Sequence, residues 1–146
     1  MKRHPSLIPL SRDHHGALIL ARLLQEDAPP YKELPLDPKG KAEYALKFYR
    51  EELLEHFAEE EKIIPVVKGI NAELDQLMKE MAEEHQELHT LFGQIDKHHD
   101  LARHLDQLGK AMEVHIRKED RQLFPMIQDN CSEAVLAEIA ETLKID

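Results

Sequence analysis

Histidines followed four positions later by a glutamate or a second histidine are the residues of this 146-residue chain best suited to chemistry. On a helix, residues four apart lie on one face about 5–6 Å from each other, so both members of a pair can reach one metal ion. Imidazole and carboxylate ligands without thiolates suit iron, manganese or zinc. The three pairs are His56 with Glu60, His85 with His89, and His115 with Glu119.

The segments that carry these pairs have the punctuation of helices. Ser11, Asn71 and Ser132 each precede a periodic apolar segment as N-caps, and strand signals are absent. Pro65 and Pro125 lie near the ends of two such segments, where each should stop or kink a helix. We predict helices over about 11–27, 40–64, 71–96, 100–124 and 132–143. The predicted fold is all-α, an up-down four-helix bundle with a short additional C-terminal helix.

Alternating steps of three and four define the inward stripe of each bundle helix, and the paired residues interrupt these stripes. His85 and His89 lie about 40° apart around the third helix, so both can face inward. On the first helix, His14 points inward and His15 outward, although His15 remains the one spare histidine that could replace an assigned ligand. The stripe of the fourth helix is Leu101, Leu105, Leu108, Met112, His115, Glu119, Gln122 and Met126.

Five inward imidazoles and two inward carboxylates are hard to accommodate without a metal. One inward histidine is usually a hydrogen-bonded core residue, but each polar group left unpaired in a core costs roughly 1–3 kcal/mol. Metal ions resolve the conflict, because each imidazole can offer one nitrogen to a cation while carboxylates bridge cations. Seven ligands are too many for one tetrahedral zinc, so two ions of higher coordination number are favoured, with iron as the best candidate. Four histidines fall outside the stripes and are predicted to be solvated or to cap helices: His4, His98, His99 and His104.

Length and charge limit the other classes of function. The length suits a single domain over residues 1–146, and the net charge of -10 without a basic cluster argues against nucleic acid and anionic membranes as partners. No secretion signal or membrane-spanning run is visible. The lone Cys131 has no partner for a disulfide within the chain, which fits a reducing compartment. We therefore expect a cytoplasmic protein, with no role assigned to Cys131.

Over nearly its whole length the pattern resembles hemerythrin and the wider hemerythrin-like HHE domain family. That family carries a His on the first helix, HxxxE on the second, HxxxH or a lone His on the third, and a His followed by a carboxylate on the fourth. The resemblance implies two non-haem iron ions, with Glu60 and Glu119 as bridges and one coordination position open. Hemerythrins place the last carboxylate five residues after its His, which is Asp120 here, whereas many family members use four, and the stripe favours Glu119. The implied metal ligands are His14, His56, Glu60, His85, His89, His115 and Glu119.

Two functions follow from the resemblance. The first is a binding protein that takes up O2, NO or peroxide at the open position, for sensing, scavenging or iron handling. The alternative is a di-iron enzyme that reduces NO or peroxide, or that donates iron for iron–sulfur cluster repair. Zinc or manganese could substitute for iron, and a bundle acting only through its surface is the third reading. The physiological ligand stays open, as does whether the last helix caps the bundle or forms a homodimer.

Overall fold

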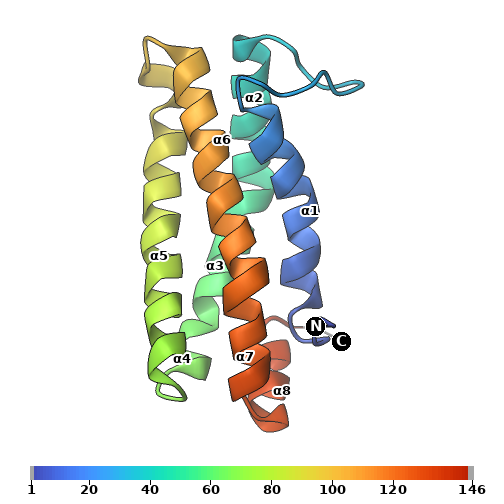
Figure 1. Ribbon diagram of the computed structural model, residues 1–146, viewed down its shortest axis with the longest axis vertical. Coiled ribbons are helices and arrows are strands. Elements are labelled where there is room, and N and C mark those ends of the chain that lie inside the picture. Colours follow the sequence, from blue (N-terminus) through green and yellow to red (C-terminus); the bar gives the residue numbers. More distant parts are fainter. Residues whose placement is uncertain (1, 145–146) are drawn as a thin grey trace.

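The computed structural model describes residues 2–144, and all regular structure in that range is helical, which confirms the predicted class (Figure 1). Two π-helical turns, η1 and η3, and one 3-10 turn, η2, join or follow α-helices. The elements are α1 Ile8–Leu23, α2 Pro38–Phe48, η1 Tyr49–Leu53, α3 Leu54–Lys62, α4 Ile64–Val67, α5 Ala72–Gly93, η2 Ile95–Lys97, α6 Leu101–Lys118, η3 Glu119–Leu123, α7 Phe124–Asn130 and α8 Glu133–Thr142.

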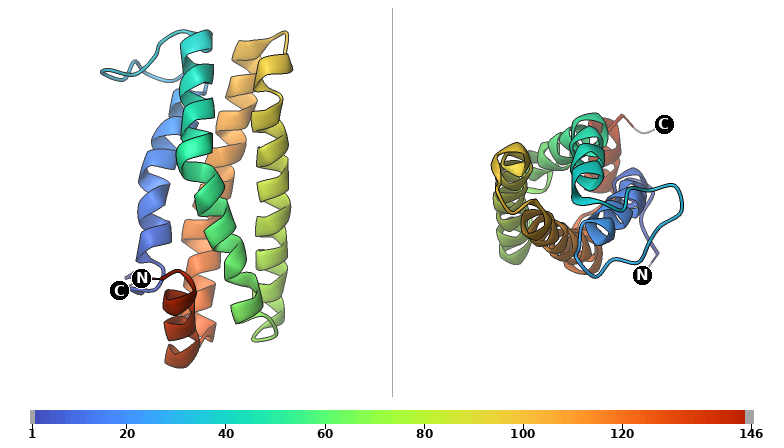
Figure 2. Two further views of the ribbon diagram at one scale, coloured as in Figure 1. Left: turned by 180° about the vertical axis from the view of Figure 1, so that it is seen from behind. Right: turned by 90° about the horizontal axis from the view of Figure 1, so that it is seen from above.

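The longer helices form rods that lie side by side along the long axis (Figure 1). They are α1, α2 continued through η1 into α3, α5, and α6 continued through η3 into α7. Seen from above, the rods surround a common axis in the order α1, α3, α5, α6 (Figure 2, right). The short helices α4 and α8 lie at the end of the rods opposite α2 (Figure 1). Among the described residues, no helix has the length and apolar character needed to cross a bilayer.

Two of the three predicted N-caps are present in the structure, and the third prediction is wrong. Asn71 accepts hydrogen bonds from the amides of Glu73 and Leu74, and Ser132 accepts one from Val135, so both predicted caps are present. Ser11 is not a cap, because α1 already begins at Ile8. Proline is favoured in a first turn, where its missing N–H needs no partner, so Pro9 helps to start α1 earlier than predicted.

The π-turn η3 changes the register of the fourth rod. This rod was predicted to end near residue 124, yet it continues as α7 to Asn130, with Pro125 in the first turn of α7. A π-turn adds a residue to the helical repeat, so the inward stripe moves on by one position. Leu123 and Ile127 are buried, whereas the predicted Gln122 is exposed and Met126 only partly buried.

The bundle interior consists of two apolar cores with a polar layer between them. The upper core, toward α2, includes Ala17, Leu20, Leu24, Leu53, Phe57, Leu88, Phe92, Leu108, Met112 and Ile116. The lower core, toward α8, includes Leu7, Leu10, Ile63, Val67, Leu74, Met78, Met81, Phe124, Ile127, Cys131, Leu136 and Ile139. Six residues of the predicted site lie along the rods between residues of these two cores, namely His14, His56, Glu60, His85, His115 and Glu119. The fold therefore holds these six at one level, away from both ends. His89 lies further along α5, between Leu88 and Leu91 of the upper core.

Candidate metal centre

The polar layer brings four histidines and two glutamates together. In each of two groups, four ligand atoms all lie within 4.8 Å of one another, and all the residues concerned are buried. The groups share both glutamates and differ in their histidines. The first group is His14, His56, Glu60 and Glu119, and the second is His85, His115, Glu60 and Glu119.

Each glutamate divides its two oxygens between the two groups. Oε2 of Glu60 lies 3.1 Å from Nε2 of His56, while its Oε1 lies 3.0 Å from Nε2 of His85. Oε1 of Glu119 lies 3.0 Å from Nε2 of His14, while its Oε2 lies 3.4 Å from Nε2 of His115. Two carboxylates placed in this way can each bridge a pair of cations, one oxygen to each.

Several of the inward atoms have no hydrogen-bond partner. They are Nε2 of His14 and His115, Oε2 of Glu60, and both carboxylate oxygens of Glu119, all of them buried. Such atoms are rare in folded proteins, because a buried polar atom without a partner is destabilising. Cations placed within the two groups would give all of them partners, so the residues present fit a pair of metal ions.

The outward nitrogen of each of these four imidazoles is hydrogen-bonded to a carboxylate. Since an ionised carboxylate only accepts, each Nδ1 donates, which leaves Nε2 as the nitrogen that faces inward. Nδ1 lies 2.8 Å from Asp120 in His14, 3.0 Å from Asp13 in His56, 2.7 Å from Glu61 in His85 and 2.7 Å from Glu84 in His115. We call Asp13, Glu61, Glu84 and Asp120 the outer carboxylates.

The apolar stripes do not point to Asp13, Glu61 or Glu84, and the sequence predicted Asp120 only as an alternative to Glu119. The structure places Glu119 in both groups and Asp120 outside them, against His14. A signal was nevertheless present, because each outer carboxylate is the immediate sequence neighbour of an inward residue. The four neighbouring pairs are Asp13 with His14, Glu60 with Glu61, Glu84 with His85, and Glu119 with Asp120.

Two other histidines lie where the stripes did not place them. His89 was predicted to face inward with His85, but it is only partly buried, belongs to neither group, and its Nδ1 is hydrogen-bonded to the Tyr49 hydroxyl. His104 was predicted to be solvated or capping, but it is buried and its Nε2 donates to the carbonyl of Leu91. His15 is exposed, whereas His14 is buried, as the stripe of the first helix predicts.

Protons are strongly held by the centre when no metal is bound. Burial lowers the pKa of His14, but the hydrogen bond to Asp120 and the nearby carboxylates of Glu119 and Glu60 outweigh it and raise that pKa to about 12. Burial likewise lowers the pKa of His56, and the charge of Glu60 with a hydrogen bond to Asp13 raises it to about 10. Burial and the charge of Glu60 raise the pKa of Glu119 to about 7. A metal ion must therefore displace protons from His14 and His56.

We expect metal binding to stabilise the protein more as the pH rises from about 6 to about 9. His14 and His56 have folded-state pKa values above the unfolded value of 6.5, so they stabilise the metal-free fold fully below pH 6.5. That contribution is lost as the pH rises toward about 10 and about 12, while bound cations compete with fewer protons. The gain in Tm on metal loading should grow by several degrees across this range. Calorimetry of both forms at pH 6, 7.5 and 9 measures it, and a constant gain would contradict the expectation.

A small cavity adjoins both groups on the side of the upper core. Its polar boundary is His14, His56, His115 and Glu119, and the rest of its wall is apolar. The room inside is ≈ 10 Å³, about that of one water-sized sphere. The apolar lining residues are Ala17, Leu53, Phe57, Leu88, Met112 and Ile116.

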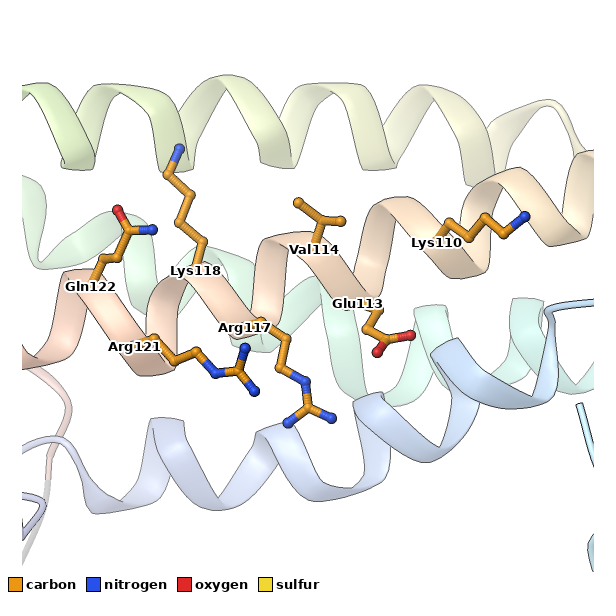
Figure 3. Close-up of a pocket in the computed structure, with 7 residues that line it drawn as sticks. All are labelled: Lys110, Glu113, Val114, Arg117, Lys118, Arg121 and Gln122. Atoms are coloured by element: carbon orange, nitrogen blue, oxygen red, sulfur yellow. The ribbon is translucent and has the colours of Figure 1, made fainter.

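The surface outside the centre carries cationic side chains. A groove over α6 and η3 is lined by Arg117, Lys118 and Arg121 around the exposed Val114, and no histidine reaches it (Figure 3). Lys118 extends toward α5, where its Nζ donates to Glu80 and Glu84, while Arg117 and Arg121 extend toward α1 (Figure 3). Among the described residues, the metal-ligand atoms thus gather inside the bundle and not in this groove.

The chain matches a known protein family over most of its length. A family model described as the hemerythrin HHE cation binding domain matches residues 9–127, which include all six residues of the two groups. No curated protein and no solved structure matches the chain.

Proposed function

This chain belongs to the hemerythrin HHE cation-binding domain family, and we propose on that premise that its polar layer binds two non-haem iron ions. Residues 1–146 would form a single domain of that family, built as an up-and-down four-helix bundle with α8 as the additional C-terminal helix. Glu60 and Glu119 would bridge the ions, with His14 and His56 on one ion and His85 and His115 on the other. Zinc or manganese could occupy the same ligands.

The observation that carries this proposal is the division of the glutamate oxygens. A site for one ion would need a single set of converging atoms, whereas here two sets share the two glutamates and no histidine. Each of the two groups would supply two histidine nitrogens and two glutamate oxygens to its metal ion. Iron accepts more ligands than four, so coordination positions would remain for a small molecule. His89, the seventh predicted ligand, stays a prediction.

We propose further that this small molecule is O2, NO or peroxide, and that the protein serves in sensing, scavenging or iron handling. The cavity beside the centre supports this proposal, because an apolar space of ≈ 10 Å³ suits a ligand of very few atoms and no larger substrate. The wall of this cavity contains no serine, threonine, cysteine or lysine, and its histidines and glutamate are candidate metal ligands. Uptake and binding are thus better supported than group transfer.

Metal analysis tests the proposal directly. Protein purified without a metal-binding tag should contain two iron ions per chain, and its ultraviolet and visible spectrum should change on addition of O2 or NO. Iron well below two per chain after reconstitution, or a spectrum unaffected by either gas, would contradict it. Two zinc ions per chain would support the two-ion site but would contradict the proposal that it binds O2, NO or peroxide.

We expect Met112→Ala to change ligand binding at the centre and the equivalent change at Met78 to leave it unaltered. Both methionines are buried, at 1% and 2% exposure, so each truncation should destabilise the fold by about 2–5 kcal/mol. Met112 lines the cavity, however, whereas Met78 lies in the lower core. The NO dissociation rate of the iron-loaded protein, measured by stopped flow, should change several-fold only in Met112→Ala. Equal effects of the two changes would show that the cavity does not take part in ligand binding.

A further inference from the structure

The outer carboxylates form a closed ring around the polar layer. Asp13 of α1 holds His56 of α3, and Glu61 of α3 holds His85 of α5. Glu84 of α5 holds His115 of α6, and Asp120 of η3, which continues α6, holds His14 of α1. The four contacts follow the order of the rods around the axis (Figure 2, right). Every rod therefore gives a carboxylate to one neighbour and receives one from the other.

We propose that the charge of this ring makes the centre bind two trivalent cations in preference to two divalent ones. The inference rests on the proposed function, since it concerns the same two positions. It extends that function by naming the charge class of the ions: under the iron proposal, the centre would favour the ferric form.

The carboxylates around the centre balance the charge of two trivalent ions. The two bridging glutamates and the four outer carboxylates provide six negative charges around imidazoles that are neutral when they bind metal. Lys118 contacts Glu84, but it contacts Glu80 as well, so this lysine and Glu80 cancel each other. Two trivalent ions would bring the centre to neutrality, whereas two divalent ions would leave a net charge of two negative units shared between the buried glutamates and the partly exposed outer carboxylates. An uncompensated buried charge is strongly unfavourable.

The four outer carboxylates differ in how deeply they are buried. The exposed fractions of the side chains of Asp120 and Glu84 are 25% and 27%, against 37% for Glu61 and 51% for Asp13. Because solvent screens charge, Asp120 and Glu84 should contribute most. Asp120 acts on His14 of the first group, and Glu84 acts on His115 of the second. Each cation position thus has one outer carboxylate that is mostly, but not fully, buried.

Replacing an outer carboxylate with the amide of the same shape removes its charge but keeps the imidazole in its orientation. In Glu84→Gln with Asp120→Asn, the amide oxygens can still accept from both Nδ1 atoms, so the imidazoles keep their orientation while two charges are lost. Glu113→Gln with Glu138→Gln is the matched control. It removes the same charge from side chains of α6 and α8 that contact none of the imidazoles: Glu113 accepts from Gln25, and Glu138 is exposed.

Competition between Ga³⁺ and Zn²⁺ for the metal-free protein, each buffered by nitrilotriacetate, measures the preference for charge without redox chemistry. The preference for Ga³⁺ should fall by about tenfold or more in Glu84→Gln with Asp120→Asn, and stay within about twofold in the control. An unchanged preference, or an equal fall in the control, would overturn the ring proposal while leaving the two-ion site in place. A wild-type protein that binds neither ion would overturn both proposals.

The midpoint potential of the iron-loaded protein gives a second readout, which also serves if the double variant fails to fold. The single changes Glu84→Gln and Asp120→Asn should each raise that potential, because removing a negative charge favours the reduced ions. Glu113→Gln should leave it unchanged. Potentials that do not move in either single variant would overturn the proposal.

Discussion

Glu60→Gln should empty both metal positions at once. Glu60 gives one oxygen to each group of ligand atoms, so losing its carboxylate removes a ligand and half a unit of compensating charge from both. A glutamine side chain offers one amide oxygen and no charge, so it cannot replace a bridge. We expect the metal content, measured by plasma mass spectrometry after reconstitution, to fall from two ions per chain to less than about a tenth of that value, in line with the loss expected when a ligand itself is removed.

Two further variants turn this result into a test of bridging. His115 belongs to one group only, so His115→Ala should leave about one ion per chain, held by His14 and His56 with the glutamates. Glu59 is the sequence neighbour of Glu60 but lies outside both groups, so Glu59→Gln should keep the wild-type content. If Glu60→Gln also retained one ion, Glu60 would serve a single position and the bridged pair would be wrong.

The inward residues of the centre could be predicted because helical periodicity decides which side chains face the core. His14, His56, Glu60, His85, His115 and Glu119 interrupt apolar stripes, and buried polar residues at matching heights on four rods need a common explanation. The outer carboxylates could not be found in this way. Side chains such as Asp13, 51% exposed, resemble ordinary surface charges in sequence, and only the packing of neighbouring rods shows which imidazole each one contacts.

The errors have separate physical causes, and only one of them is a departure from the regular helical repeat. The turn η3 moves the stripe beyond Glu119 by one residue, and no local signal other than Pro125 hints at it. The same regular repeat placed His89 inward, whereas it lies partly exposed against Tyr49. Burial of His104 depends on a contact with the carbonyl of Leu91 at the end of another rod, which sequence periodicity does not contain.

The close packing of α1 on α6 depends on a residue that has no role in the chemistry. At Gly109, an added Cβ would lie 2.5 Å from the carbonyl oxygen of Ala21 and 3.0 Å from Cβ of Leu24. The first of these is a backbone atom of α1, so it can move only if the helix moves. The neighbouring contact between Gln25 and Glu113 shows that the two rods also meet through side chains at this level. Since α1 contributes His14 to the centre, the position of the rod matters for metal binding as well as for stability.

Gly109→Ala should therefore destabilise the metal-free protein by about 1–3 kcal/mol, the usual penalty for overpacking a closely packed core. The matched change Gly93→Ala has open space around the new methyl group and should stabilise α5 by up to about 1 kcal/mol, because alanine favours the helix over glycine. Urea unfolding of both variants measures the two signs. Because the clash lies between α1, which carries His14, and α6, which carries His115, metal loading of Gly109→Ala should fall below that of the wild type. A variant as stable as the wild type would mean that α1 is free to shift without loss, and its helix contact would then not be what fixes His14.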